Sequence, residues 1–401
     1  MTQLKEDVAA MPCRANRHAK LGPAFAIAAA VAAAYLPSTA FAASPTLVTG
    51  TNPTAPVALE PHPEITGTVY ALWPNTTTPA WPLYTIPSEV AAFTKYLPNV
   101  KLVQQVGNND QALQQSQVEA AITAKASAVV FSPVVPTAAG GALKEFADAN
   151  IPVIALRQDP IGGPVNSYVW VDFQGVGKFW GDYLTQHLVS DVGHKPVKLA
   201  MILGDPTFEV YNRWTNGVKP ALDALVASGD VQIVCKIDTK GFVPATAQAN
   251  MDQCLTTNAG NVDAVLVMQD STGNGVAASL TSQNLLGKVK YYGGHDGDVV
   301  ALQRILLGYQ YGTFKPDGKQ TALGTVALVI AALTGKTPES TGYINAKFMN
   351  GFYPDGVPTF LAPETLVTAE NMQKTVVDDG FLPKEKICTA AVADTAFCKG
   401  N

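Results

Sequence analysis

The sequence has few charged residues and lacks the short motifs of the common nucleotide-binding and hydrolytic folds. Only 15% of the 401 residues are charged, and 32 acidic residues outnumber 27 basic ones. Proteins that bind nucleic acid need clustered lysines and arginines to neutralise phosphates, so that partner is disfavoured. Phosphate loops, dinucleotide fingerprints, nucleophile elbows and zincin helices do not occur in the sequence. We therefore predict no cofactor and no nucleic-acid partner.

Long apolar stretches are also missing after the first 42 residues. No later segment is a run of the roughly 20 predominantly apolar residues that a membrane-spanning helix needs, so we expect no membrane insertion. Hydrophobic residues nevertheless make up 47% of the chain, which excludes a disordered polyelectrolyte. At roughly 150 residues per domain, the length indicates two globular domains. We expect a soluble monomer.

The N-terminal segment has the pattern of an export signal. Four basic residues precede the uncharged apolar run 24–36, and Ala40-Phe41-Ala42 is a small-x-small cleavage site. The alternative is an alanine-rich helix of the fold itself, whose small side chains would have little to pack against. We predict that residues 1–42 are a signal peptide, cleaved after about Ala42, and that the protein is periplasmic.

Four cysteines follow the predicted cleavage site, and they allow three pairings. Proximity in the sequence favours Cys235 with Cys254 and Cys388 with Cys398. An oxidising periplasm permits both bridges. No spacing resembles a zinc site, so we predict disulfides and no metal.

Short apolar runs alternate with longer amphipathic ones from residue 64 onward. Residues 43–63 are rich in Pro, Thr and Ala, and we interpret them as a flexible leader. The predicted strands are 67–73, 100–106, 128–132, 152–156, 168–171, 198–203, 231–237, 264–268 and 290–293. The predicted helices are 88–96, 111–125, 138–149, 175–189, 215–227, 245–257, 274–284 and 321–333. This rhythm predicts an α/β fold with two doubly wound units, about 64–162 and 163–315.

Polar and aromatic residues follow many of the predicted strands. Ligands of open α/β sheets bind beyond the carboxyl ends of the strands, which makes these residues candidates for a binding site. They are Trp81 after the first strand, Arg157, Asp172, Phe173, Phe242, Gln269, Asp270 and Asp296. Acids and amides bond hydroxyl groups, an arginine presents a planar fork, and aromatic faces cover apolar patches. The mixture suits a small polyhydroxylated ligand.

Asp270, and His295 beside Asp296, have a second interpretation. Asp270 could simply cap the helix that begins near Thr272. His295 stands beside Asp296 at a strand end, so it could act as the base of an exported hydrolase, although a loop histidine beside a ligand-binding acid is the simpler role. We predict no catalytic residues.

Several segments, taken in order and spacing, resemble the type I periplasmic sugar-binding proteins of ABC importers, and most of all their D-xylose-binding branch. The likeness covers about residues 64–388. It is carried by the segments 128–137, 149–157, 267–270, 292–296, 312–316, 357–361 and 375–381.

The resemblance implies two Rossmann-like lobes joined by a three-crossing hinge that close on a sugar. Lobe 1 would comprise 64–162 and 316–347, lobe 2 would comprise 163–315 and 348–387, and 388–401 would be a disulfide-closed tail. It also implies roles for individual side chains. The family's sugar-contacting residues fall on Arg157, Asp172, the pair Gln269-Asp270, Asp296, the hinge residue Lys315 and the ring-covering Phe242.

Two departures from the family concern the ligand. The loop after the first strand keeps an aromatic residue, Trp81, but has no arginine, and Phe173 stands where the family tends to have asparagine. We therefore expect a solute receptor for a sugar or sugar-like molecule that docks on an ABC permease of the inner membrane. The alternatives are a receptor for a chemotaxis or sensor-kinase system and a binder of a partly aromatic metabolite.

Overall fold

The computed structural model describes residues 46–49, 59–76, 81–158, 162–349, 352–353 and 355–400. The predicted signal peptide, most of the predicted leader and residues 77–80 lie outside these ranges. The sheets of the fold and the helices that cover them lie within these ranges.

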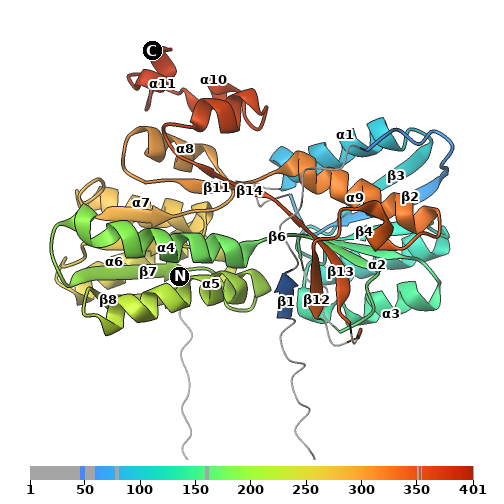
Figure 1. Cartoon of the computed structure of the whole chain (residues 1–401), viewed down its shortest axis with the longest axis horizontal. Helices are drawn as coiled ribbons and strands as arrows, with labels where there is room; N and C mark the ends of the chain where they lie inside the picture. The colour runs from blue at the N-terminus through green and yellow to red at the C-terminus, as the bar shows by residue number, and fades with distance from the viewer. Residues whose placement is uncertain are drawn as a thin grey trace, which may run out of the picture. The chain divides into compact units, whose positions relative to one another are not determined.

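The first sheet has eight strands in the order β1-β12-β13-β6-β5-β4-β2-β3 (Figure 1). Six of them, from β13 to β3, run parallel, while β12 is antiparallel to β13 and β1 to β12. The strands are β1 (Thr46–Thr49), β2 (Gly67–Trp73), β3 (Val100–Val106), β4 (Ala128–Phe131), β5 (Val153–Leu156), β6 (Ser167–Val171), β12 (Ala346–Met349) and β13 (Val357–Ala362).

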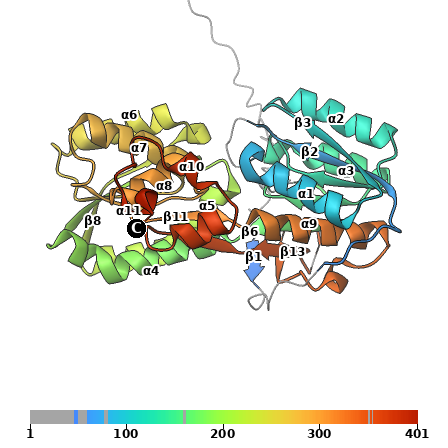
Figure 2. The same cartoon turned by 90° about the horizontal axis from the view of Figure 1, so that it is seen from above.

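Helices cover both faces of this sheet because both faces of its central strands are apolar. In β4, Ala128 and Val130 pack on the side of α1 (Ile86–Tyr96) and α9 (Gly318–Leu333). Val129 and Phe131 pack on the side of α2 (Gln111–Thr123) and α3 (Gly140–Asp148). Figure 2 shows these two helix pairs on opposite sides of the strands. A short π-helical turn, Trp81–Thr85, leads into α1.

The second sheet has four parallel strands in the order β10-β9-β7-β8. They are β7 (Val197–Leu203), β8 (Val231–Asp238), β9 (Ala264–Val267) and β10 (Lys290–Gly293). One face is covered by α4 (Phe173–Val192) and α5 (Glu209–Ala227). The other face is covered by α6 (Pro244–Thr257) and α7 (Asp270–Ser282). The two sheets with their helices confirm the predicted α/β class.

The chain crosses between the two sheets at three places. The first crossing is at Asp172, which joins β6 to α4 and caps that helix by accepting a hydrogen bond from the Gly175 amide. The second crossing leads from β11 (Thr313–Pro316) to α9, and the third leads from β13 to β14 (Glu364–Val367). β11 and β14 pair antiparallel in a small separate sheet. Between β10 and β11 lies α8 (Val299–Leu306), which the sequence did not predict.

Two strands lie in a different sheet from the one expected. The sequence pattern placed 168–171 in the second unit and the family resemblance placed 348–387 in lobe 2, but β6 and β13 both belong to the first sheet. Every residue of β6 is buried, and the strand pairs with β5 on one side and β13 on the other. Such a strand requires a neighbour on each edge, and β13 supplies the second one from far along the chain.

The C-terminal residues form two short helices, α10 (Lys384–Ile387) and α11 (Ala396–Lys399), which Figure 1 shows beside α8. The Gln303 side chain on α8 donates to the Ile387 carbonyl at 2.8 Å. The structure joins Cys388 to Cys398 and Cys235 to Cys254, the pairing that proximity favours.

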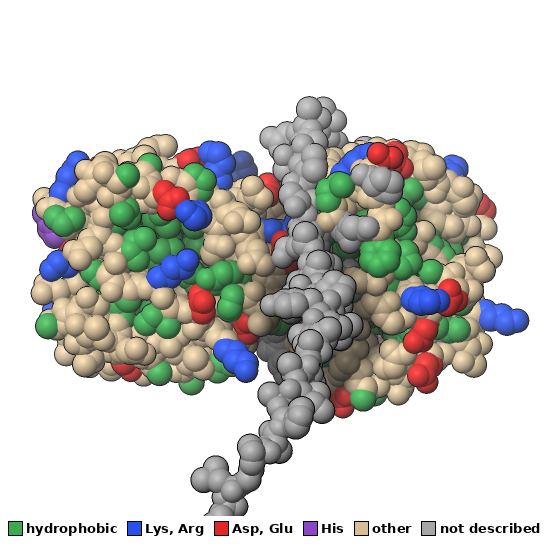
Figure 3. Space-filling view, turned by 90° about the horizontal axis from the view of Figure 1, so that it is seen from below, with side chains coloured by type: hydrophobic (Ala, Val, Ile, Leu, Met, Phe, Trp, Pro, Cys, Tyr) green, Lys and Arg blue, Asp and Glu red, His purple; other side chains and the backbone are tan. Residues whose placement is uncertain are grey.

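The described part of the chain contains no helix with both the length and the apolar character needed to cross a bilayer. On the face in Figure 3, basic and acidic side chains are interspersed rather than gathered by sign.

Candidate functional site

Arg157 and Asp296 meet although they follow strands of different sheets. Arg157 comes directly after β5 and Asp296 follows β10, and an Arg157 Nη2 atom lies 3.8 Å from Asp296 Oδ1. The Arg157 Nη1 group donates to Thr85 Oγ1 at 3.3 Å, and the guanidinium carbon is 5.8 Å from the centre of the Trp81 ring. Three of the predicted residues, Trp81, Arg157 and Asp296, therefore form one cluster.

Both charged members of this cluster have left-handed backbones. Arg157 has φ of 58° and Asp296 has φ of 98°. This region is costly for side chains larger than glycine and is concentrated at functional sites.

His295 lies between two carboxylates. Its Nδ1 atom is 3.1 Å from Asp296 Oδ1, and its Nε2 atom is 3.0 Å from Glu364 Oε2. Its ring centre is 4.7 Å from that of Phe173. Burial lowers the pKa of His295, but the charges of Glu364 and Asp296 outweigh burial and raise it to about 10.

That arrangement bears on the hydrolase alternative. At neutral pH both ring nitrogens of His295 are protonated and donate to carboxylates, so the ring cannot take a proton from a nucleophile. Asp296 in turn stays ionised: burial raises its pKa, but the hydrogen bond and charge of His295 and the charge of Arg157 outweigh burial and lower it. The pair therefore provides fixed charges.

Asp270 is fully buried and connects three segments. Its two carboxylate oxygens lie 2.9 and 3.0 Å from the Thr313 hydroxyl, and the Asp298 amide donates to Oδ2 at 2.9 Å. Its own amide donates to the His295 carbonyl. Burial, followed by the charge of Asp298, raises the pKa of Asp270 well above its usual range. The carboxylate thus bonds to segments outside α7 rather than to the first amides of that helix, so the capping interpretation does not describe it.

Besides Phe173 and Asp270, four further predicted residues lie outside the Trp81–Arg157–Asp296 cluster. Asp172 caps α4, and the Gln269 side chain donates to Ser271 Oγ at 2.7 Å. Phe242 packs edge-on against Phe208, with ring centres 5.5 Å apart. The Lys315 Nζ group donates to Asp379 Oδ2 at 2.8 Å. The assignment of all nine predicted residues to a ligand site remains a prediction.

Sequence reasoning missed two residues that hold Asp296. The Tyr84 hydroxyl donates to the Asp296 carbonyl at 2.7 Å, and burial raises the pKa of Tyr84 so that this proton is retained. Glu364 contacts His295, whose other ring nitrogen contacts Asp296. Glu364 begins β14, a strand that no periodic pattern predicted, and Tyr84 lies in the turn before α1. Neither position carries a motif that could have identified it.

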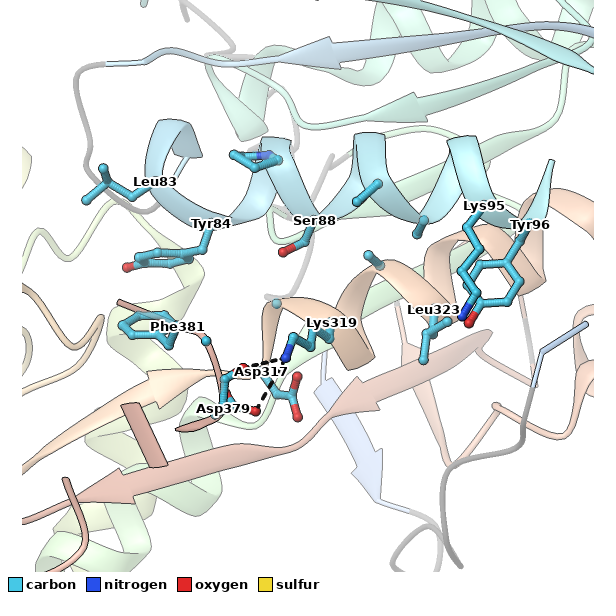
Figure 4. A pocket seen from close by; sticks show the side chains of 16 residues that line it. Leu83, Tyr84, Ser88, Lys95, Tyr96, Asp317, Lys319, Leu323, Asp379 and Phe381 are labelled. Carbon is cyan, nitrogen blue, oxygen red and sulfur yellow. Dashed lines mark hydrogen bonds and ion pairs between the residues drawn. The ribbon is translucent and has the colours of Figure 1, made fainter. Parts of the chain in front are cut away.

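A cavity of about 440 Å³ lies next to this cluster, and Figure 4 shows its lining. It is bounded by α1, the beginning of α9 and residues 379–381. At one end the rings of Tyr84 and Phe381 are 4.7 Å apart, and Lys319 reaches the Asp379 carbonyl. None of the predicted ligand residues lines this cavity, but Tyr84 borders it and also binds Asp296.

Comparison with known proteins identifies the family. A family profile described as "Periplasmic binding protein domain" matches residues 74–337. The chain belongs to this family. Since the family consists of binding proteins, membership agrees with the expectation that the chain is not an enzyme. Among the described residues, no group of three His, Cys, Asp or Glu is placed to hold a metal ion.

Two characterised relatives of this periplasmic binding protein are 30% identical to it. The D-xylose-binding periplasmic protein of Haemophilus influenzae aligns over 289 residues, which are 72% of this chain and 82% of the relative. The multiple sugar-binding periplasmic receptor ChvE of Rhizobium radiobacter aligns over 295 residues, 71% of this chain and 82% of the relative.

Solved structures share its fold. A carbohydrate transporter solute-binding protein from Chloroflexus aurantiacus, in complex with D-glucose, superimposes with a TM-score of 0.71 at 19% identity, over 80% of this chain and 98% of that one. An ABC transporter solute-binding protein from Clostridium phytofermentans gives 0.68 at 24% identity, over 80% and 99%. These matches confirm the periplasmic-binding-protein fold that the sequence predicted.

Proposed function

We propose that this protein is the solute receptor of an ABC importer and binds a sugar or sugar-like molecule at the Arg157–Asp296 cluster. The observation that carries the proposal is the 3.8 Å contact between these side chains, because it joins the carboxyl ends of strands in two different sheets. The names of the relatives, which include a D-xylose-binding protein and a multiple sugar-binding receptor, support a sugar as the ligand.

The side chains of the cluster suit a neutral polyol. Asp296 is ionised and accepts hydrogen bonds from hydroxyl groups, while the Arg157 guanidinium donates to ring and hydroxyl oxygens. The Trp81 and Phe173 rings offer apolar faces to the CH groups of a sugar. Asp172, Phe242, Gln269, Asp270 and Lys315 complete the proposed site.

We further propose that binding works by closure of two lobes. One lobe consists of the first sheet with its helices and the other of the second sheet with residues 364–387, joined by crossings at 172, 317 and 363. A ligand held from both sides favours the closed form by its differential affinity for that form. The closed form then docks on a permease of the inner membrane.

Export is part of the proposal. The relatives are named periplasmic proteins, and the segment 1–42 has the features of a cleaved signal peptide. Mass spectrometry of the mature protein from a periplasmic extract tests this: an N-terminus near Ala43 is expected, and retention of residues 1–42 would contradict it.

Isothermal titration calorimetry of the mature protein with D-xylose, D-glucose, L-arabinose and myo-inositol tests the function. At least one should bind with a Kd in the micromolar range or below. Arg157→Gln should weaken that binding at least tenfold, whereas Lys95→Gln, on the exposed part of α1, should not change it. Failure of every sugar and polyol to bind would refute the sugar assignment.

A further inference from the structure

Glu364, His295 and Asp296 form a continuous line of hydrogen bonds. The imidazole ring has a carboxylate oxygen at 3.1 Å from one nitrogen and at 3.0 Å from the other. Two carboxylate oxygens can both be satisfied only when the ring carries both protons. The His295 and Glu364 side chains are 1% and 5% exposed, so water does not compete for these bonds.

The Asp296 carboxylate depends on this line for its orientation. Its backbone is fixed by other contacts, since its amide donates to the Phe314 carbonyl and its carbonyl accepts from Tyr84. Its Oδ1 atom, however, is held by His295 at 3.1 Å and lies farther, 3.8 Å, from Arg157. The ring of His295 is in turn placed by Glu364 on one edge and Phe173 on one face.

We propose that Glu364 is a positioning residue for ligand binding, which acts through His295 to hold the Asp296 carboxylate beside Arg157. The inference rests on the proposed function, because it takes Asp296 as a ligand-binding group. Glu364 lies on β14, directly after the third crossing between the sheets. The line of bonds therefore ties the hinge to the binding site.

The charged groups near His295 give the proposal a pH signature. Glu364 on β14 and Asp296 in the same loop contact the ring directly, and Arg157 lies beyond Asp296. Asp270 is linked to His295 through its amide, which donates to the His295 carbonyl. From α4 only the uncharged Phe173 ring contacts His295. With both carboxylates present the pKa of His295 is about 10, so the ring stays charged up to pH 9. Without Glu364, burial opposes only one carboxylate and the pKa falls.

The experiment compares Glu364→Gln, which keeps the shape and removes the charge, with Glu364→Asp and with Glu339→Gln, an exposed control of equal charge change. Calorimetry with D-xylose and D-glucose is run from pH 6 to pH 9. Wild type and Glu339→Gln should show a flat profile. Glu364→Gln should bind about fivefold more weakly at pH 6 and at least twentyfold more weakly at pH 8.5, and Glu364→Asp should recover part of the loss.

Nitrogen-15 NMR of the His295 ring gives a readout that needs no ligand. In wild type the ring should stay doubly protonated from pH 6 to pH 9, and in Glu364→Gln it should titrate within that range. A ring that titrates near neutrality in wild type overturns the proposal. So does a Glu364→Gln variant whose ring titrates but whose affinity and pH profile match wild type.

Sugar binding and the positioning role of Glu364 can be refuted separately. If wild type binds neither sugar, the proposed function is refuted for these ligands, while the ring titration and the Asp296 carboxyl chemical shift still decide whether Glu364 holds His295 and Asp296. If wild type binds and only the Glu364 variants behave as wild type, the function stands and the positioning role is refuted.

Discussion

Replacing Glu89 with glutamine should stabilise the protein increasingly as the pH rises from 5 to 8 and leave its stability nearly unchanged at pH 5. Glu89 is 1% exposed on α1 and accepts one hydrogen bond, from the Thr325 hydroxyl on α9 at 2.9 Å. Its Oε2 atom has no hydrogen-bond partner among the described residues. Burial therefore raises the pKa of Glu89 from 4.5 to about 8, and the Thr325 bond only partly opposes this.

The direction in which the free energy of unfolding changes with pH follows from proton linkage. Below pH 4.5 Glu89 is protonated in both the folded and the unfolded chain. Between pH 4.5 and 8 the unfolded chain releases this proton and the folded one keeps it, so the free energy of unfolding falls by about 1.4 kcal/mol per pH unit. Wild type should therefore lose on the order of 4 kcal/mol between pH 5 and pH 8 that Glu89→Gln retains.

Urea unfolding of both proteins at pH 5, 6, 7 and 8 measures this difference. Glutamine keeps the oxygen that accepts the Thr325 bond, so the two curves should nearly coincide at pH 5 and separate steadily above it. Glu119→Gln on α2, an exposed position, is the matched control and should track wild type. A Glu89→Gln difference that is the same at every pH would refute the linkage argument.

Three further perturbations test other parts of the structure. Cys388→Ser with Cys398→Ser opens a loop of 10 residues and should cost roughly 2–3 kcal/mol of unfolding free energy, measured by urea unfolding; an unchanged midpoint would show that the tail adds no stability. Gly204→Ala places a Cβ 2.0 Å from Phe242 Cε1 and should displace that ring, so sugar affinity should fall several-fold in calorimetry; unchanged affinity would remove Phe242 from the site. Arg304→Met removes the groups that donate to Asn274 and Gln310 and should lower the free energy of unfolding by about 3 kcal/mol. An unchanged free energy of unfolding would show that those bonds are dispensable.

The parts of the fold that the sequence predicted are those with strong periodicity. Strands 67–73, 100–106 and 290–293 have the predicted limits. The strands β12, β13 and β14 were missed. β13 pairs with β6 and β14 pairs with β11, both distant in the sequence, so local pattern alone does not identify them.

The candidate site shows the same limit. Arg157 and Asp296 were predicted as members of one site because both follow parallel strands, and they are in contact. Glu364 and Tyr84 could not be predicted, since Glu364 begins a strand that no periodic pattern predicted and Tyr84 lies in the turn before α1. Lys315 was expected at a hinge and does lie on β11 at a crossing, but its partner there is Asp379.

The two sheets differ in how much of the chain must be present before they can form. The four strands β7 to β10 come from one continuous stretch, 197–293, whereas β6 is flanked by β13, which begins at residue 357. During synthesis from the N-terminus, the edge of β6 in the first sheet therefore stays unpaired while the second sheet is already complete. Pairing across so many residues is slow, so a chaperone that binds exposed strand edges would be needed longest at β6.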